Sequence, residues 1–211
     1  MSAKQSALIT FEGGDGSGKS TQCRLIHQDL LDAGYTAHLF REPGGTPISE
    51  QIRDILLDTA NTAMSPVTEM LLYFASRNQL LNERIQPALA AGEIVILDRF
   101  VESTLAYQGY GRGLDLKQIE QVRDVAIGAL HPDLTILVDT PLETAEERLD
   151  QGRRDRLDAE KASFKARVRE GYLKLAASDP AHWFTVDGRE EIPVLRQKIW
   201  QRVLSLLRES P

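Results

Sequence analysis

The stretch that decides the fold of this 211-residue chain is "ALITFEGGDGSGKST", residues 7–21. Its first six residues are mostly apolar and predict a buried strand, and the residues from Lys19 onward predict a helix. Between these elements, Gly13, Gly18, Lys19 and Ser20 match the pattern G-x-x-x-x-G-K-[ST], in which backbone N–H groups surround phosphate oxygens. A strand, a glycine-rich turn and a helix in this order indicate a phosphate loop that binds ATP or GTP.

The same stretch predicts how a nucleoside triphosphate is held. The Lys19 ammonium is expected to reach the β- and γ-phosphates, and the Ser20 hydroxyl is expected to bind Mg²⁺. The helix that follows adds the partial positive charge of its amino end. The residues predicted to contact ATP in this loop are Gly13, Gly14, Asp15, Gly16, Ser17, Gly18, Lys19, Ser20 and Thr21.

A second motif, "IVILDRF", occupies residues 94–100. Asp98 follows four apolar residues, where proteins with a phosphate loop commonly place a carboxylate on the metal side, and Arg99 is expected to project into the same crevice. From spacing alone, a buried ion pair at a strand end explains these charges equally well. The agreement with the first motif favours the functional interpretation, so Ser20 and Asp98 are the predicted metal ligands.

Short apolar runs alternate with longer helical stretches along the chain. The predicted strands are 7–12, 37–42, 93–100, 134–140 and 183–188, and the predicted helices are 19–33, 46–59, 66–91, 115–130, 141–150, 158–178 and 191–208. This alternation predicts an α/β three-layer sandwich of the P-loop NTPase type, with a five-stranded parallel sheet flanked by helices. Ligands in such folds bind beyond the carboxyl ends of the strands. Residues 107–115 are predicted to form a glycine-rich loop.

The composition excludes some classes of partner. A net charge of −6 argues against a general binder of nucleic acids or membrane surfaces, because both are themselves negatively charged. Cys23 is the only cysteine, so no intrachain disulfide is expected, which favours the cytoplasm. No apolar run approaches the length of a transmembrane helix.

Two classes of nucleotide-binding protein remain from the residues themselves. A GTPase is excluded because the chain carries no guanine-reading Asn-Lys-x-Asp motif. A protein kinase is excluded because its lysine would lie on a separate strand and not in a phosphate loop. Small-molecule phosphoryl transfer and a regulatory ATPase or switch are still open. Two arginine clusters favour transfer between two phosphorylated ligands, and they consist of Arg41, Arg53, Arg77 and Arg99 and of Arg153, Arg154 and Arg156.

With these motifs identified, the chain resembles the thymidylate kinase family over essentially its whole length. The long block of residues 97–113 is specific to that family among nucleotide kinases, whereas the phosphate loop alone is not. The resemblance implies ATP-dependent phosphorylation of dTMP to dTDP, for dTTP synthesis, with Mg²⁺. The motifs that carry it are "EGGDGSGKS" (12–20), "REPGGT" (41–46), "IRDILLD" (52–58), "LLYFASRNQL" (71–80), "LDRFVESTLAYQGYGRG" (97–113), "HPDLTILVD" (131–139) and "DRLD" (155–158).

The resemblance also implies a dTMP site. Phe74, Arg77 and Asn78 share one helix face, and the family stacks thymine on the position of Phe74 while Arg77 donates to a thymine carbonyl. Read alone, a helical phenylalanine is more often a core residue. The residues that the resemblance assigns to dTMP are Asp15, Glu42, Pro43, Arg53, Phe74, Arg77, Asn78, Arg99, Ser103, Thr104, Tyr107 and Gln108.

Within this set, the resemblance gives each group a part of the nucleotide. Arg53 and Arg99 match positions that hold the 5′-phosphate, and Thr104 and Gln108 match positions near the base. Tyr107 matches a residue against the deoxyribose, although a tyrosine packed in a loop would explain the same residue. Asp15 matches a carboxylate that meets the 3′-hydroxyl, although aspartate also simply tolerates a tight turn.

The arginine that stabilises the transfer is expected in a lid at about residues 148–160. The interior of the phosphate loop holds no arginine, which matches the bacterial type of the family. Arg156 aligns best with the lid arginine and Arg153 is second, so Arg156→Ala is expected to lower kcat far more than it raises the KM for dTMP. Arg148 is expected to flank adenine. The predicted catalytic residues are Asp15, Lys19, Arg99, Arg153 and Arg156.

We therefore expect residues 1–211 to form a single nucleoside monophosphate kinase domain. The resemblance implies a homodimer, and neither nucleic acid nor membrane is expected as a partner. The alternatives are a kinase for another nucleoside monophosphate and a regulatory ATPase or switch with a phosphate loop.

Overall fold

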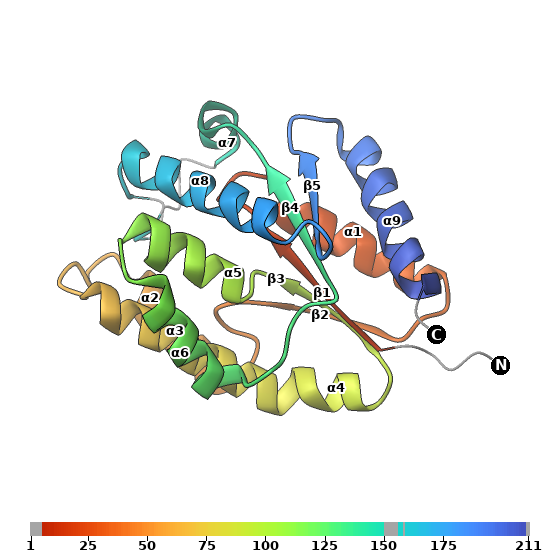
Figure 1. The fold of residues 1–211 in the computed structure, drawn as a ribbon, viewed down its shortest axis with the longest axis horizontal. Coiled ribbons are helices and arrows are strands. Elements are labelled where there is room, and N and C mark those ends of the chain that lie inside the picture. Colours follow the sequence, from red (N-terminus) through yellow and green to blue (C-terminus); the bar gives the residue numbers. More distant parts are fainter. Residues whose placement is uncertain (1–5, 150–155, 158, 210–211) are drawn as a thin grey trace.

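A parallel β-sheet forms the centre of the protein in a computed structural model that describes residues 6–149, 156–157 and 159–209 (Figure 1). All the strand pairs are parallel and follow the order β2-β3-β1-β4-β5. The strands are β1 (Ala7–Glu12), β2 (Ala37–Arg41), β3 (Ile94–Asp98), β4 (Leu134–Asp139) and β5 (Trp183–Asp187). The predicted α/β class and five-stranded parallel sheet are confirmed.

Helices connect the strands and cover both faces of the sheet. Local sequence begins several of them: the Thr46 hydroxyl accepts from the Ser49 N–H before Pro47, and Ser65 caps the next helix before Pro66. The helices are α1 (Lys19–Asp32), α2 (Pro47–Leu57), α3 (Pro66–Leu80), α4 (Gln86–Ala90), α5 (Val101–Thr104), α6 (Leu116–Ile127), α7 (Leu142–Arg148), α8 (Ala162–Ser178) and α9 (Ile192–Glu209), with π-helical segments η1 (Leu81–Ile85) and η2 (Leu105–Gly111).

Strand alternation divides the apolar core between the two faces. Ile9 and Phe11 of β1 pack in one cluster with Ile26 of α1 and with α9, whereas Leu8 packs in another with Phe74 and the helices α3 to α6. Figure 1 shows α1 and α9 on one side of the sheet and α3 to α6 on the other. Since β1 is buried along its whole length, it is fully enclosed by these layers.

The register places the candidate site at one edge of the sheet. Asp98 of β3 pairs with Phe11 of β1 and with Arg41 of β2. The three segments that follow these strands therefore leave the sheet side by side, as is usual for ligand sites in parallel sheets. These segments carry the phosphate loop, Glu42 and Arg99.

Two predictions of local structure need correction. Residues 107–115 were expected to form a loop, but η2 extends through Gly111, so Tyr107 and Gln108 lie in a π-helix. The expected helix at 66–91 is continuous but widens at η1, just before Pro87. Proline has no N–H and clashes with the carbonyl four residues earlier, which accounts for a change of hydrogen bonding there.

In the part of the chain that the structure describes, none of the helices has the length and apolar character needed to cross a membrane.

Candidate active site

Glycine is required in the phosphate loop by its backbone. Gly13, Gly16 and Gly18 have positive φ angles of 142°, 76° and 94°. A Cβ on Gly13 would lie 2.6 Å from the Val138 carbonyl oxygen, and one on Gly16 would collide with the Ala145 carbonyl. Only glycine lets the loop adopt these angles while it packs this closely against β4 and α7.

Lys19 and Asp15 face each other across this loop. The Lys19 Nζ donates to the Gly14 carbonyl oxygen at 3.4 Å and lies 3.6 Å from an Asp15 carboxylate oxygen. Its side chain is 7% exposed, whereas that of Asp15 is 38% exposed. The ammonium is thus held within the loop, where a phosphate can replace the carbonyl as its partner.

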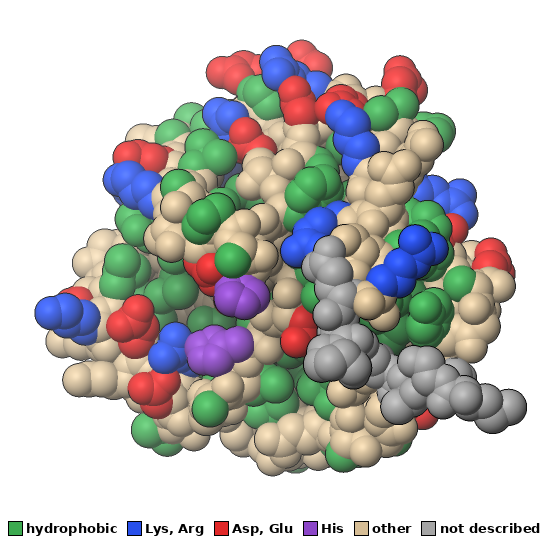
Figure 2. All heavy atoms as spheres, turned by 45° about the vertical axis from the view of Figure 1, so that its right-hand side comes forward, with side chains coloured by type: hydrophobic (Ala, Val, Ile, Leu, Met, Phe, Trp, Pro, Cys, Tyr) green, Lys and Arg blue, Asp and Glu red, His purple; other side chains and the backbone are tan. Residues whose placement is uncertain are grey.

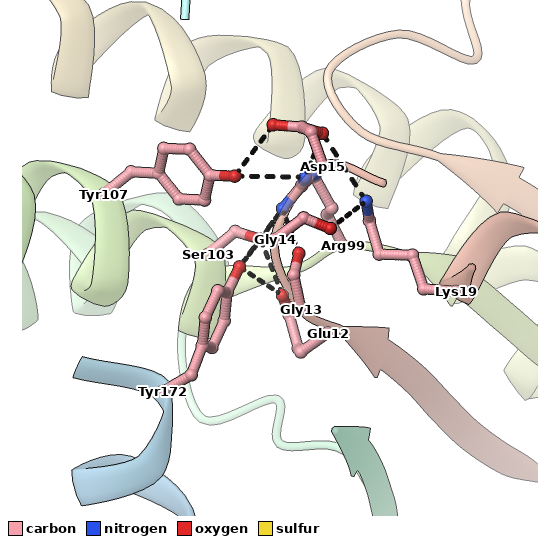
Figure 3. Close-up of polar contacts among 9 residues, drawn as sticks. All are labelled: Glu12, Gly13, Gly14, Asp15, Lys19, Arg99, Ser103, Tyr107 and Tyr172. Carbon is pink, nitrogen blue, oxygen red and sulfur yellow. Dashed lines mark hydrogen bonds and ion pairs between the residues drawn. The ribbon is translucent and has the colours of Figure 1, made fainter. Parts of the chain in front are cut away.

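Arg99 joins the loop to the segments that follow β3 (Figure 3). One guanidinium nitrogen donates to Asp15 Oδ1 at 2.6 Å, and the other donates to the Gly13 carbonyl oxygen at 3.1 Å. Arg99 has a φ of 75°, which is unusual for a residue other than glycine and costs about 1–3 kcal/mol. The strain is maintained by contacts that aim this side chain at the loop.

Two residues that the motifs did not predict support Arg99: Tyr172 contacts it directly, and Glu12 acts through Tyr172 and Ser103. Tyr172 of α8 accepts from Arg99 at 3.1 Å, and its hydroxyl donates to Glu12 at 3.0 Å. Glu12 is fully buried and also accepts from the Ser103 hydroxyl and the Phe100 N–H. The position of Glu12, directly before the loop, is a signal that could have identified it, but no local pattern connects Tyr172 to the site.

The surroundings of three carboxyl groups at the site shift their pKa values in different directions. Burial acts to raise the pKa of Asp15, but the nearby charges of Arg99 and Lys19 outweigh it and hold this pKa well below its usual range. Burial raises the pKa of Glu12 above its ordinary value. Burial also raises the pKa of Glu42 to about 7, against the opposing charge of Arg77. Asp15 is therefore ionised at neutral pH.

A polar cleft of about 480 Å³ opens beside Asp15 and Arg99. The structure brings nine of the twelve predicted dTMP residues to this cleft: Asp15, Glu42, Pro43, Arg53, Arg99, Ser103, Thr104, Tyr107 and Gln108. The lining also includes Leu57, Tyr73 and Leu157, which were not predicted.

The structure does not bring Phe74 to the polar cleft. Its ring is 2% exposed and packs in the core of the α3 to α6 face, 5.1 Å from the Arg77 guanidinium. Tyr73, one residue earlier, lines the cleft instead. Adjacent helical residues point about 100° apart, so the aromatic residue at the cleft is the one four positions before Arg77. Spacing by itself does not separate Tyr73 from Phe74, because residues three and four positions before Arg77 both lie on its face of the helix.

Arg77 and Asn78 also lie outside the cleft lining. Arg77 is 1% exposed and donates to the Glu42 carboxylate at 2.6 Å, to the Thr104 hydroxyl at 3.0 Å and to the Phe100 carbonyl. It therefore supports two residues of the cleft from behind. The Asn78 amide donates to the Ala126 carbonyl oxygen and so faces α6.

A second cavity, of about 630 Å³, lies between the phosphate loop, β4, α7 and α8. We name it the apolar chamber, because residues such as Leu137, Leu142, Phe164 and Val168 line it. Gly13, Gly14, Asp15 and Ser17 form its boundary with the loop.

Arg148, predicted to flank adenine, is exposed and donates to the Gly188 carbonyl oxygen after β5.

The predicted lid arginines have separate outcomes. Arg153 and Arg154 lie outside the described residues. Arg156 is described, and its guanidinium pairs with Glu69 of α3 at 2.5 Å and donates to the Leu56 carbonyl at the end of α2. The structure thus ties Arg156 to α2 and α3 rather than to the phosphate loop.

Ser20 and Asp98, the predicted metal ligands, carry oxygen donors that suit Mg²⁺. Ser20 lies in the first turn of α1 and Asp98 ends β3. Burial and, after it, the Asp98 charge raise the pKa of the Cys23 thiol on α1, so the Asp98 carboxylate acts on the face of that helix that carries Cys23. A hydroxyl and a carboxylate are the oxygen ligands that Mg²⁺ prefers.

Comparison with known proteins decides the family. A family model described as thymidylate kinase matches residues 11–199. The chain belongs to the thymidylate kinase family. The resemblance predicted from the motifs is therefore confirmed.

Individual members of the family show the same likeness. The chain is 50% identical to the thymidylate kinase of Desulforudis audaxviator over 97% of this chain and 93% of the relative. It is 45% identical to that of Geotalea uraniireducens over 96% and 99% of the two chains. The solved structure of thymidylate kinase from Ehrlichia chaffeensis superposes with a TM-score of 0.77 at 32% identity, covering 95% of this chain and 99% of that one.

Proposed function

We propose that this protein transfers the γ-phosphoryl group of ATP to dTMP and releases dTDP, a step in dTTP biosynthesis. The observation that carries the proposal is that the phosphate loop and the polar cleft share Asp15, whose carboxylate pairs with Arg99. Phosphoryl transfer requires donor and acceptor to be held in line at short distance. A phosphate loop that shares Asp15 with an adjacent polar cleft meets this requirement.

On the donor side, the N–H groups of residues 13–21 and the amino end of α1 bind the ATP phosphates. Lys19 exchanges its contact with the Gly14 carbonyl for a phosphate oxygen. Ser20 and Asp98 would hold Mg²⁺, which supplies neutralisation of phosphate charge when it is bound. Arg148 is proposed to lie near adenine.

On the acceptor side, different cleft residues are proposed to contact the phosphate, the sugar and the base of dTMP. Arg53 and Arg99 are proposed to hold the 5′-phosphate, and Tyr107 to lie against the deoxyribose. The Tyr73 ring is proposed to stack on the base, because it is the aromatic side chain that α3 presents to the cleft. Arg77 then acts by positioning Glu42 and Thr104.

Catalysis by these residues rests on position and charge. Transfer of this kind needs little covalent chemistry from the protein, so no general base is assigned. Arg99 is held on Asp15, Ser103, Tyr107 and Tyr172, so its charge is preorganised before the acceptor binds. Of the predicted lid arginines, Arg153 is proposed to stabilise the transferred group.

A coupled assay of ADP formation with and without dTMP tests this proposal. We expect ADP release that depends on dTMP and equals the dTDP formed. ATP turnover independent of dTMP, with no dTDP, would instead identify a regulatory ATPase or switch. Comparable kcat/KM values for dCMP, dGMP or UMP would identify a kinase for another nucleoside monophosphate.

We further propose a cytoplasmic homodimer in which each chain is one kinase domain with a lid near residues 148–160. Apolar side chains exposed on α2 and α3 support self-association, since Ile48, Ile55, Val67 and Leu71 are each about half exposed.

Figure 2 shows acidic and basic side chains interspersed on the face that it presents, without the basic stripe typical of nucleic-acid binders.

A further inference from the structure

Glu69 of α3 is a buried carboxylate that does not itself line the polar cleft. It is 1% exposed, yet it has partners from several segments. Its Oε1 accepts from the Gln108 amide nitrogen at 2.7 Å and from Arg112 Nε at 3.2 Å. Its Oε2 accepts from Arg112 at 3.1 Å and pairs with Arg156 at 2.5 Å.

These partners keep Glu69 in its ionised form. Burial acts to raise its pKa, but hydrogen bonds from Arg112 and Gln108, with the charges of Arg112 and Arg156, hold the pKa below its ordinary value. An ionised carboxylate can only accept hydrogen bonds. The Gln108 amide must therefore turn its nitrogen toward Glu69, which leaves its carbonyl oxygen as the end available on the opposite side.

Gln108 lines the polar cleft, so its orientation matters to a bound base. An amide oxygen there accepts from a ring N–H and repels a ring lone pair. Thymine carries an N–H at ring position 3, whereas cytosine carries a lone pair at that position. Thr104 is less selective, because its hydroxyl can rotate to donate or accept while it takes a bond from Arg77.

We propose that Glu69 is a positioning residue that fixes the amide of Gln108 with its oxygen toward the polar cleft, and thereby favours pyrimidine nucleotides with an N–H at ring position 3. This inference rests on the proposed function, since it concerns how the acceptor of that reaction is chosen. When a base without this N–H binds, the fixed Gln108 oxygen has no hydrogen-bond partner. The free energy lost in this way disfavours that base.

The variant Glu69→Gln tests the proposal, because glutamine can donate as well as accept and so releases Gln108 to turn over. We measure kcat/KM for dTMP and for dCMP at saturating ATP. The ratio of dTMP to dCMP is expected to fall by about tenfold, equivalent to one hydrogen bond of ~1.4 kcal/mol. A residue that only stabilises the fold would lower both values in proportion, so an unchanged ratio overturns the proposal.

Arg112→Lys is the matched control. It disturbs the ion pair at the same carboxylate but leaves Glu69 facing Gln108, so the ratio is expected to stay within about twofold of the wild type. An equal loss of selectivity in Arg112→Lys would assign the effect to the ion pairs and overturn the proposal. Thermal unfolding of each variant establishes that it is folded.

Gln108→Leu keeps the test decisive if Glu69→Gln does not fold. It is expected to lose the same selectivity, and where Glu69→Gln does fold, the double variant should lose no more selectivity than Gln108→Leu alone. A selective Gln108→Leu enzyme overturns the proposal. Wild-type protein that forms no dTDP would defeat the proposed function, whereas a dTMP kinase whose selectivity ignores Glu69 would defeat only this inference.

Discussion

The predicted binding groups of the phosphate loop come from the consecutive residues 13–21, whereas the polar cleft is lined by residues that range from Asp15 to Leu157. The loop works mainly through backbone N–H groups and glycine conformations, which are properties of the local chain. The cleft is lined by side chains from α2, α3, α5 and η2 and from the segments that follow β2 and β3, and their directions depend on how those elements pack. The two neighbouring regions therefore differ in how readily their functions can be inferred from residue order.

Replacing Lys19 is expected to cause the largest loss of activity. Lys19→Met retains the length of the side chain but removes the cation that faces the phosphates, so kcat is expected to fall by roughly 10²–10³-fold. The selectivity among acceptor nucleotides should be unchanged, because the cleft is intact. Steady-state kinetics with several acceptors measures both quantities. Lys117→Met, at an exposed lysine of α6, is the control, and equal activity of the two variants would contradict the role of Lys19.

A pair of neighbouring substitutions on α3 sharpens the comparison for the cleft. Tyr73→Ala is expected to raise the KM for dTMP by about tenfold through loss of stacking, with little change in the KM for ATP. Phe74→Ala should instead lower the free energy of unfolding by about 3–5 kcal/mol, because Phe74 is a core residue. Kinetics and chemical denaturation separate the two. A stable Phe74→Ala protein with weakened dTMP binding would return the stacking role to Phe74.

Arg156 distinguishes an anchor from a catalytic arginine. Since it pairs with the buried Glu69, Arg156→Ala is expected to lower the free energy of unfolding by about 3 kcal/mol, while kcat of the folded enzyme changes little. This differs from the sequence-based expectation of a large loss of kcat. Arg123→Ala, which removes an exposed pair with Asp124, should change stability by less than about 1 kcal/mol. A large loss of kcat without a loss of stability would support the catalytic role.

The smallest expected effect is a pH dependence at the floor of the cleft. Burial raises the pKa of Glu42 to about 7 from an ordinary value of 4.5. Between these pH values the folded protein keeps a proton that the unfolded chain has released, so this carboxyl makes stability fall as the pH rises from about 4.5 to about 7. The Tm should decrease over this range by a few degrees, and less in Glu42→Gln. A variant with the same pH profile as the wild type would contradict the shift.

Much of the architecture could be predicted because it depends on local patterns. Apolar runs of strand length alternate with helical stretches, and this order alone requires parallel strands with helical crossovers. The segment around η2 was missed, because its glycines suggest a loop while packing of α8 and α6 against Gly111 and Gly109 holds it helical. Glycine propensity was overridden by tertiary contact.

The phosphate loop, the parallel sheet and the family can be predicted from residue order, because each depends on residue types at short, regular spacing. Packing of the layers, in contrast, brings Tyr73 rather than Phe74 to the cleft, Tyr172 to Arg99, and Glu69 to Gln108, Arg112 and Arg156. Those contacts join residues that lie far apart in the sequence, such as Glu69 and Arg156, and a change of one residue along a helix turns a side chain by about 100°. Side-chain partners at such separations are chosen by how the layers pack, which no local pattern contains.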